Sequence, residues 1–419
     1  MRSPSSVALG TDLDWLRRVL WPGEGLVRVS SDSVPIRGFR RARTYAVLPS
    51  ARRPRLLVPL ADRRAARASL FQFNDSMTQG ARVRKAIAGL GVGFTLGRSL
   101  ARDRLHVDVS ADVGDPDLAS LLLEEHLARM LGVDEVVTAI AFGSLRPNRK
   151  PILQIMRPDG SVLGYAKLAW NTLTERLVAT EAGALRALTT MPPKTFATPT
   201  LLVTGTWRGR PLSITSPIRQ HVRRRGRHLA MPPPDILREI AEREGLDWLP
   251  LARVPLVGDI REGLEAGPPN EEREEVRRLL DRLEAAAGDS RILVGAWHGD
   301  CGPWNMDRSP RGITIWDWER ARSGVPVGLD IAHVALQLAL QRTGRRPGDA
   351  LEAAGPAGIA GLRELGVEPE TWPILRSLYL FELFLRYDEA TNEGVIGRDD
   401  QVRREIVTVL RRMPWERTA

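Results

Sequence analysis

The chain is poor in several residue types, and each shortage excludes a class of protein. Its 419 residues include one cysteine, Cys301, which excludes an intrachain disulfide framework. Aromatic residues make up 5% of the sequence, and no RNA- or DNA-binding signature accompanies its positive charge, so we expect no nucleic-acid partner. No apolar run approaches the roughly 18 to 20 residues of a membrane span. Since the first residues also lack the apolar core of a signal peptide, we expect a cytoplasmic protein.

Lysine is scarce as well, although the formal net charge is +10. Of the 61 basic residues, four are lysines and the remaining 57 are arginines. The lysines are Lys85, Lys150, Lys167 and Lys194. A lysine in a segment of functional interest is therefore conspicuous against an arginine-rich background.

The most informative segment extends from residue 297 to residue 319. It contains WHGDCGPWN over 297–305 and IWDWE over 315–319. A transferred phosphoryl group needs its charge neutralised by metal and its acceptor hydroxyl held in line. Asp300 has the carboxylate to accept the proton of that hydroxyl, and Asn305 and Asp317 have the oxygen atoms that Mg²⁺ prefers. Turn residues over 309–312 and a β-rich run over 313–316 place these two ligands at opposite ends of a hairpin. The segment predicts a phosphoryl-transfer centre.

This pattern resembles a known family. HGDxxxxN over 298–305, followed by Asp317, looks like the catalytic signature of the aminoglycoside phosphotransferase and choline-kinase-like branch of the protein-kinase-like fold. That family phosphorylates small-molecule hydroxyls, so the resemblance implies ATP, or GTP in its place, and Mg²⁺ as cofactors. The segment 324–332 resembles the family's next segment, where an aspartate at the head of a helix holds the catalytic loop. The resemblance gives that supporting role to Asp330, and we expect His298 to brace the same loop by hydrogen bonding.

The resemblance also implies an α+β fold of two lobes, a small antiparallel-sheet lobe and a mainly helical catalytic lobe. The upstream sequence fits the first lobe, because 136–142, 152–156 and 161–168 read as three consecutive strands. In kinase-like folds the lysine of the third strand contacts the nucleotide phosphates and pairs with a glutamate of the next helix. These roles are expected of Lys167 and of Glu181, which lies in a helical pattern over 175–188.

Further nucleotide and metal contacts are less sharply defined by the sequence. Backbone N–H groups near Gly143 and Ser144 can contact phosphate, with Arg146, Arg149 or Lys150 adding charge, although an ordinary hairpin turn is the alternative. The linker strand 212–217, which includes Ser216, is expected to recognise adenine through backbone groups. Glu319, in the sequence Asp-Trp-Glu, is either a ligand of a second metal or the partner of a neighbouring arginine.

The first 130 residues resemble no family that we recognise. Segments 56–60 and 105–109 read as strands, and 61–73, 80–90 and 116–131 read as helices. Ten arginines between Arg37 and Arg67 face a single acidic residue, Asp62, which suits a surface for acidic partners, with a solvated arginine-rich face as the alternative. We therefore divide the chain into an N-terminal α/β extension of unknown role (1–130), a nucleotide-binding lobe and hinge (131–218) and a catalytic, substrate-binding lobe (219–419).

The sequence as a whole predicts a phosphotransferase that acts on a small-molecule hydroxyl, as in a sugar, an amino alcohol or an aminoglycoside. We expect the acceptor to meet polar side chains of segment 372–390, and the positive net charge argues against a polycationic acceptor. The candidates in that segment are Glu382, Arg386, Tyr387, Asp388 and Glu389. Two other classes remain open: a catalytically silent nucleotide-binding regulator, and a basic binding or scaffold protein that acts through the N-terminal region.

Overall fold

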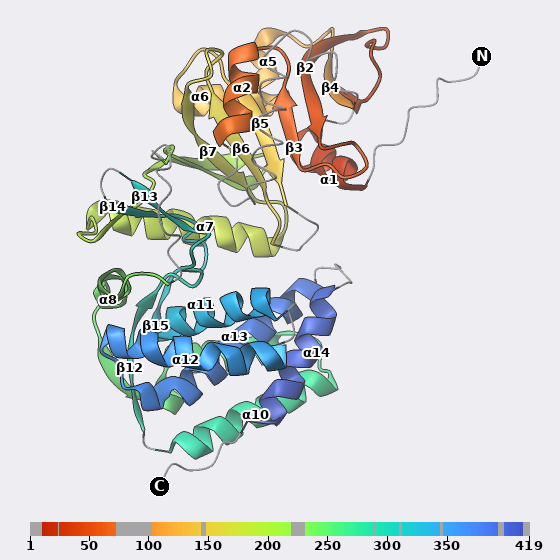
Figure 1. Cartoon of the computed structure of the whole chain (residues 1–419). Coiled ribbons are helices and arrows are strands. Elements are labelled where there is room, and N and C mark those ends of the chain that lie inside the picture. The colour runs from red at the N-terminus through yellow and green to blue at the C-terminus, as the bar shows by residue number, and fades with distance from the viewer. Residues whose placement is uncertain are drawn as a thin grey trace. The chain divides into compact units, whose positions relative to one another are not determined.

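The chain forms two compact units (Figure 1). The computed structural model describes residues 11–23, 25–72, 103–143, 148–218, 231–288, 290–309, 312–343, 347–392 and 398–413. The first unit comprises Met1–Ala182 and Thr200–Pro217, and the second comprises Gly183–Pro199 and Ile218–Ala419. The predicted division into three parts by role, 1–130, 131–218 and 219–419, stays a prediction. Over the described ranges, no helix has both the length and the apolar character needed to span a bilayer.

The first unit is built on a nine-stranded sheet in which every pair of neighbouring strands is antiparallel. The strand order is β1-β4-β2-β3-β5-β6-β7-β10-β9. The strands are β1 (Val27–Ser30), β2 (Phe39–Leu48), β3 (Leu56–Pro59), β4 (Arg104–Ser110), β5 (Val137–Phe142), β6 (Pro151–Met156), β7 (Val162–Leu168), β9 (Leu201–Trp207) and β10 (Arg210–Thr215). The three strands predicted before Lys167 are β5, β6 and β7.

Strands from before residue 131 are part of this same sheet. In β3, Leu56 pairs with Ala141 and Leu57 with Ile140 of β5, so hydrogen bonding is continuous from the N-terminal strands to those of the predicted nucleotide lobe. Alternation of side chains along a strand predicts which residues are buried but not which strand lies next to it. The sheet therefore joins two regions that the sequence pattern separates.

Helices cover this sheet and complete its core. Trp21, Tyr45 and Trp207 are its largest fully buried side chains, and the indole Nε1 of Trp207 donates to the carbonyl of Leu20 at the end of α1. Arg149 also holds α1, because its buried guanidinium pairs with Asp12. The helices are α1 (Thr11–Leu20), α2 (Arg63–Gln72), α5 (Asp115–Leu121), α6 (Leu123–Leu131) and α7 (Thr172–Thr190), whose last residues lie in the second unit.

The prediction of one continuous helix over 116–131 was wrong. The segment 116–131 forms two helices, because Leu122 between them adopts an extended conformation with φ −111° and ψ 123°. The extended residue redirects the chain while both helices keep buried leucines on the core. The predicted helix 80–90 lies outside the described residues.

Several arginines of the N-terminal region pair with carboxylates that are distant in sequence. The excess of arginine between residues 37 and 67 is therefore partly neutralised within the unit. The pairs are Arg40–Asp115, Arg41–Asp108, Arg43–Glu125 and Arg55–Asp12.

The second unit contains two small three-stranded sheets. One has the order β11-β12-β15 and is antiparallel, and in the other the β13–β14 hairpin is extended by β8, which runs parallel to β14. The strands are β8 (Phe196–Ala197), β11 (Asp247–Pro250), β12 (Arg291–Trp297), β13 (Met306–Ser309), β14 (Gly312–Ile315) and β15 (Arg322–Pro326).

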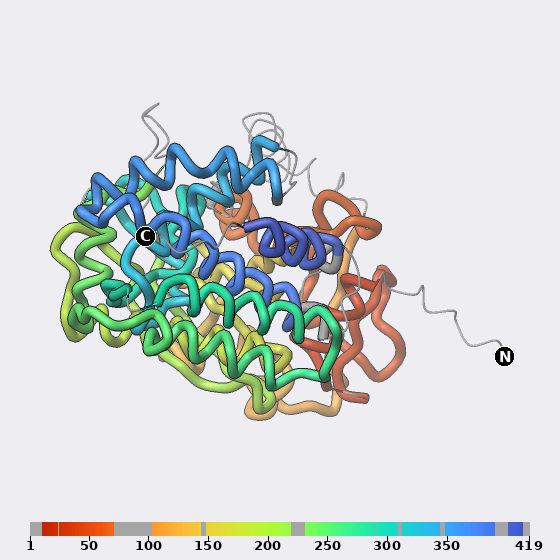
Figure 2. Tube along the Cα trace, turned by 90° about the horizontal axis from the view of Figure 1, so that it is seen from below, coloured from red at the N-terminus to blue at the C-terminus, as the bar shows by residue number. Residues whose placement is uncertain are grey.

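Helices make up most of the second unit, and α11 lies at their centre. This helix buries ten of its residues, and its neighbours α12 and α13 pack against it. Helices α9 and α10 run side by side in green in Figure 2. The helices are α8 (Pro234–Glu242), η1 (Leu251–Arg253), α9 (Pro255–Ala266), α10 (Glu271–Ala287), α11 (Leu329–Arg342), α12 (Pro347–Leu365), η2 (Pro369–Thr371), α13 (Trp372–Asn392) and α14 (Arg398–Arg411). The α+β fold class is confirmed, with an antiparallel-sheet unit and a mainly helical unit.

Candidate active site

The loop after β12 is attached to α11 through the carboxylate of Asp330. The backbone N–H of His298 donates to Asp330 Oδ2 at 2.8 Å, and that of Gly299 donates to Asp330 Oδ1 at 2.9 Å. Asp330 is buried, and a buried carboxylate needs such donors to remain favourable. The two bonds fix the backbone that leads into Asp300, which is the arrangement required by the supporting role expected of Asp330.

His298 links this loop to Trp316, the residue that follows β14. The backbone N–H of Asp300 donates to Nδ1 of His298 at 3.2 Å, so the ring proton is on Nε2, which donates to the carbonyl of Trp316 at 3.1 Å. Burial lowers the pKa of His298, an effect that nearby carboxylates only partly oppose, and the ring therefore stays neutral at pH 7. His298 braces the loop as a neutral hydrogen-bonding group.

Asp300 is half-buried and accepts hydrogen bonds on both carboxylate oxygens. Its Oδ1 accepts from the Trp304 indole and lies 2.8 Å from Nε2 of His333, while its Oδ2 accepts from Nδ2 of Asn305 at 2.9 Å. Burial raises the pKa of Asp300, but the hydrogen bond and charge of His333, together with the Trp304 bond, outweigh it and the net pKa is lowered. The carboxylate is therefore ionised and held in one orientation.

The sequence reasoning missed His333. It is buried on α11, one turn after Asp330, and its Nδ1 lies 2.7 Å from the hydroxyl of Tyr379 on α13. That hydroxyl also accepts from Gln337 at 3.2 Å, so hydrogen bonds connect Gln337 through Tyr379 and His333 to Asp300. Residues i and i+3 share a helix face. The i+3 spacing from Asp330 was therefore the available signal.

Asn305 and Asp317 flank the open end of the β13–β14 hairpin. Met306 pairs with Ile315, and the N–H of Trp316 donates to the carbonyl of Asn305 at 3.1 Å. The ends of the two strands are thus adjacent, and the residues on either side of them are held together.

These two residues fit a Mg²⁺ site. Both side-chain hydrogen bonds of Asn305 in the described part of the chain come from Nδ2, which leaves its amide oxygen as a ligand. Asp317 has φ +70°, a left-handed conformation that is uncommon outside glycine and gathers at functional sites. Among the described residues no cluster of three or more His, Cys, Asp or Glu side chains has metal-binding geometry.

Other predicted residues of this region have simpler surroundings. Glu319 is half-buried, and its expected place at a second metal stays a prediction. Cys301 is fully buried, and burial raises its pKa well above the ordinary value, so its thiol is not a nucleophile. Asp388 was wrongly expected to meet substrate, because it is buried between Arg273 and Arg403 and joins α13 to α10 and α14.

In the first unit, Lys167 and Glu181 form the predicted pair. Nζ of Lys167 on β7 lies 2.8 Å from Oε1 of Glu181 on α7, and the Glu181 side chain is 5% exposed. This pair is the arrangement that orients a lysine ammonium for phosphate contact. The contact with nucleotide itself stays a prediction.

The remaining expected nucleotide contacts are less well supported by geometry. The N–H of Ser216 donates to the Thr200 carbonyl, and its hydroxyl accepts from the Thr200 N–H, so the N–H is already used within the unit. The carbonyl of Gly143 accepts from Arg55 at 3.4 Å. Ser144 lies outside the described residues. Of the three basic candidates, Arg149 stacks on Trp15 and pairs with Asp12, so it is not available to phosphate, and Arg146 lies outside the described residues.

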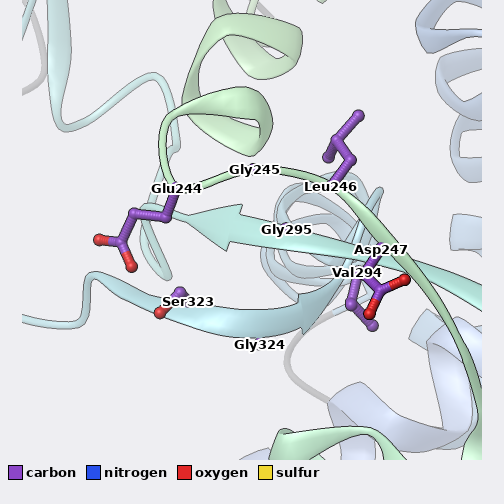
Figure 3. Close-up of a pocket in the computed structure, with 8 residues that line it drawn as sticks. All are labelled: Glu244, Gly245, Leu246, Asp247, Val294, Gly295, Ser323 and Gly324. Atoms are coloured by element: carbon purple, nitrogen blue, oxygen red, sulfur yellow. The ribbon is translucent and has the colours of Figure 1, made fainter.

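A pocket of about 250 Å³ lies away from these residues (Figure 3). Its walls come from segment 244–247 and from β12 and β15. None of the predicted site residues lines it, so it is distinct from the cluster around Asp300.

Comparisons with known proteins give resemblance at the level of structure. No protein-family model matches the chain, and no curated protein sequence matches it. A thermostable mutant of aminoglycoside phosphotransferase APH(4)-Ia is 13% identical over 69% of this chain and 98% of its own, with a TM-score of 0.46. Choline kinase LicA from Streptococcus pneumoniae is 16% identical over 69% of this chain and 99% of its own, with a TM-score of 0.43.

A choline/ethanolamine kinase family protein from Mesorhizobium loti is 12% identical over 70% of this chain and 95% of its own, with a TM-score of 0.44. Structures of APH(4)-Ia mutants include ternary complexes with AMP-PNP or ADP and hygromycin B. These neighbours are aminoglycoside phosphotransferases and choline or choline/ethanolamine kinases, and their likeness to this chain is distant.

Proposed function

We propose that this protein is a Mg²⁺-dependent phosphotransferase that transfers the γ-phosphoryl group of ATP to a hydroxyl of a small molecule. The observation that carries the proposal is the Asp300 carboxylate. It is ionised, oriented by His333, Trp304 and Asn305, and adjacent to an amide oxygen suited to a cation. A general base must be in the correct protonation state and in a fixed place before the acceptor binds.

In this proposal Asp300 accepts the proton of the acceptor hydroxyl as its oxygen bonds to the γ-phosphorus. The bond between the γ-phosphorus and the β,γ-bridging oxygen breaks, and ADP leaves with that electron pair. Asn305 and Asp317 would hold Mg²⁺, which neutralises phosphate charge when bound. Lys167, oriented by Glu181, would contact nucleotide phosphates. Asp330 and His298 keep the loop in place and touch no reacting atom.

ADP release over a panel of hydroxyl compounds tests the proposal. The panel would contain sugars, amino alcohols, hydroxy acids and aminoglycosides, each with ATP or GTP and Mg²⁺. Asp300→Asn should lower turnover by at least about 100-fold, the scale of general-base catalysis, and leave nucleotide binding unchanged. Asp281→Asn is a matched control, because Asp281 is a half-exposed aspartate on α10.

Two results would reject the proposal. Turnover retained in Asp300→Asn would remove the assigned base. Nucleotide binding without turnover of any acceptor would instead favour a silent regulator.

A further inference from the structure

Three arginines gather around one buried carboxylate beside the catalytic loop. Nε of Arg386 donates to Glu382 at 3.0 Å, and Nη2 of Arg322 lies 3.7 Å from the same carboxylate. The third arginine, Arg320, lies close enough to Glu382 and Arg386 to interact with their charges. We refer to Arg320, Arg322, Arg386 and Glu382 as the arginine cluster.

The cluster touches the loop that carries the base. Nη1 of Arg386 donates to the carbonyl of Gly299, the residue before Asp300, at 3.2 Å. Gly299 has φ +81°, and a Cβ there would lie 2.6 Å from the backbone oxygen of Arg320, so the backbone of Arg320 packs directly on the loop. Arg320 also interacts with the charge of Asp300. The cluster is therefore within reach of a small molecule whose hydroxyl lies at Asp300.

Positive charge exceeds negative charge in this cluster. Glu382 is shared by Arg386 and Arg322, and Arg322 has a second partner in the half-exposed Asp259 at 2.8 Å. Within the described part of the chain Arg320 makes no hydrogen bond and no ion pair, although it is half-buried. In addition, Nη2 of Arg386 is buried and has no hydrogen-bond partner.

An unpaired, half-buried guanidinium is unfavourable on its own. The charges of Glu319, Glu382 and Asp300 act on Arg320, but none of these carboxylates makes a hydrogen bond or an ion pair with its guanidinium. Removing a charge from water is costly unless a partner of opposite sign is supplied, and arginine is well suited to bind the planar oxygens of carboxylate or phosphate. Arg320 therefore has no direct anionic partner among the described residues, and its backbone packs on the loop of the proposed base.

We propose that Arg320 binds an anionic group of the acceptor, so that the substrate is a hydroxyl compound that also carries a carboxylate or a phosphate. This inference rests on the proposed function and narrows it to a class of acceptor. A cationic amino alcohol or aminoglycoside would meet Arg320 as a like charge, which provides selection against those acceptors. The charge of Arg320 alone is enough to favour an anionic acceptor over a cationic one, so the inference needs no contact between the protein and the rest of the acceptor.

The first experiment compares acceptors of matched size and different charge. Glycerate, glycerol and choline would be tested with wild type, Arg320→Gln, Arg320→Lys and the control Arg278→Gln, an exposed arginine on α10. We expect turnover to rank glycerate above glycerol and glycerol above choline. Arg320→Gln should raise KM for glycerate at least tenfold and leave KM for glycerol unchanged. Arg320→Lys should have a KM for glycerate between those of wild type and Arg320→Gln. The control Arg278→Gln should match wild type.

The second experiment needs no turnover, so failure of the inference is separable from failure of the proposed function. Inorganic phosphate at constant ionic strength should raise the Tm of wild type and of Arg278→Gln but not of Arg320→Gln. An equal shift in Arg320→Gln, or no shift in wild type, would overturn the inference.

Nucleotide binding identifies the source of the anion. Stabilisation by ATP and Mg²⁺ should be the same in wild type and Arg320→Gln. If the variant loses it, the missing anion is a nucleotide phosphate and the inference about the acceptor fails. Preferential turnover of choline or glycerol over glycerate would also reject it.

Discussion

Nε2 of His333 lies 2.8 Å from Oδ1 of Asp300, and His333 follows Asp330 by one turn of α11. One buried face of α11 therefore holds the loop at two points. Asp330 accepts from two backbone N–H groups of the loop, and His333 contacts the carboxylate of the proposed base. Since α11 is packed on nearly all sides, the orientation of Asp300 depends on the core of the second unit. The geometry of the site is thus fixed by the fold rather than by the loop alone.

His333→Ala should reduce turnover without weakening nucleotide binding. The Asp300 carboxylate would keep two donors but lose the one that comes from α11, and a misplacement of about 1 Å can cost roughly 100-fold in rate. We expect kcat to fall roughly 10- to 100-fold with an unchanged KM for ATP. His333→Gln should recover part of the activity, because its amide retains an N–H donor near the position of Nε2. A purely structural residue would change Tm without this rescue of kcat, so equal activity in the two variants would contradict the assignment.

Asp330→Asn should destabilise the second unit and lower activity. An asparagine has one acceptor oxygen where the carboxylate has two, so one of the N–H groups of His298 and Gly299 would be left buried without a partner. The expected loss of unfolding free energy is about 1–3 kcal/mol, measured by urea unfolding. Asp349→Asn, at an exposed position in the first turn of the neighbouring helix α12, serves as control and should lower the unfolding free energy by less. An unfolding curve that matches wild type would show that these bonds are not needed.

The local parts of this site could be predicted from the sequence, because their meaning depends on short spacings. Asn305 and Asp317 are separated by a turn and two β-rich runs, which form β13 and β14. The strands that lead to Lys167 are likewise visible as short β-rich runs separated by turn residues, and its partner Glu181 follows within the next helix.

What could not be predicted depends on contacts between distant segments. The i+3 spacing places His333 on the same helix face as Asp330, but no local pattern shows that its ring reaches Asp300 or that the backbone of Arg320 packs on Gly299. Pairing of β3 with β5 places the N-terminal strands in the sheet of Lys167, although nothing in either strand specifies that neighbour. The N–H of Ser216 donates to the carbonyl of Thr200, and this contact too depends on the folded structure and not on a local sequence pattern.

Stability should depend on pH through Glu239 of α8. Burial raises the pKa of Glu239, but hydrogen bonds from the hydroxyl and N–H of Thr195 and the N–H of Lys194 outweigh it, so its pKa lies below the ordinary value. A depressed pKa means that ionised Glu239 stabilises the folded state above the unfolded pKa, and that this stabilisation is lost as pH falls through the folded pKa.

Glu239→Gln should therefore lower the unfolding free energy by about 1–2 kcal/mol at pH 7. The difference should shrink as pH falls below 4.5, the ordinary pKa of the group. Urea unfolding of both proteins at several pH values measures it. A difference that is independent of pH would contradict the role of the charge.

Arg273→Met should destabilise the packing of α13. Asp388 is buried between Arg273 and Arg403, and loss of Arg273 leaves it with one partner. Removing one member of a buried ion pair costs about 3–5 kcal/mol, because the other charge remains buried. Arg277→Met on the same helix removes a more exposed pair with Glu274 and should lower the unfolding free energy far less. Equal losses in the two variants, measured by urea unfolding, would show that burial of the Asp388 group does not matter.

The most direct test of the central claim is nucleotide-dependent thermal stability. Wild type and Asp317→Ala would be heated with ATP or GTP, each with and without Mg²⁺. A phosphoryl-transfer site predicts a nucleotide-dependent rise in the Tm of wild type that requires Mg²⁺ and is lost in Asp317→Ala. The absence of any shift in wild type with either nucleotide would contradict it.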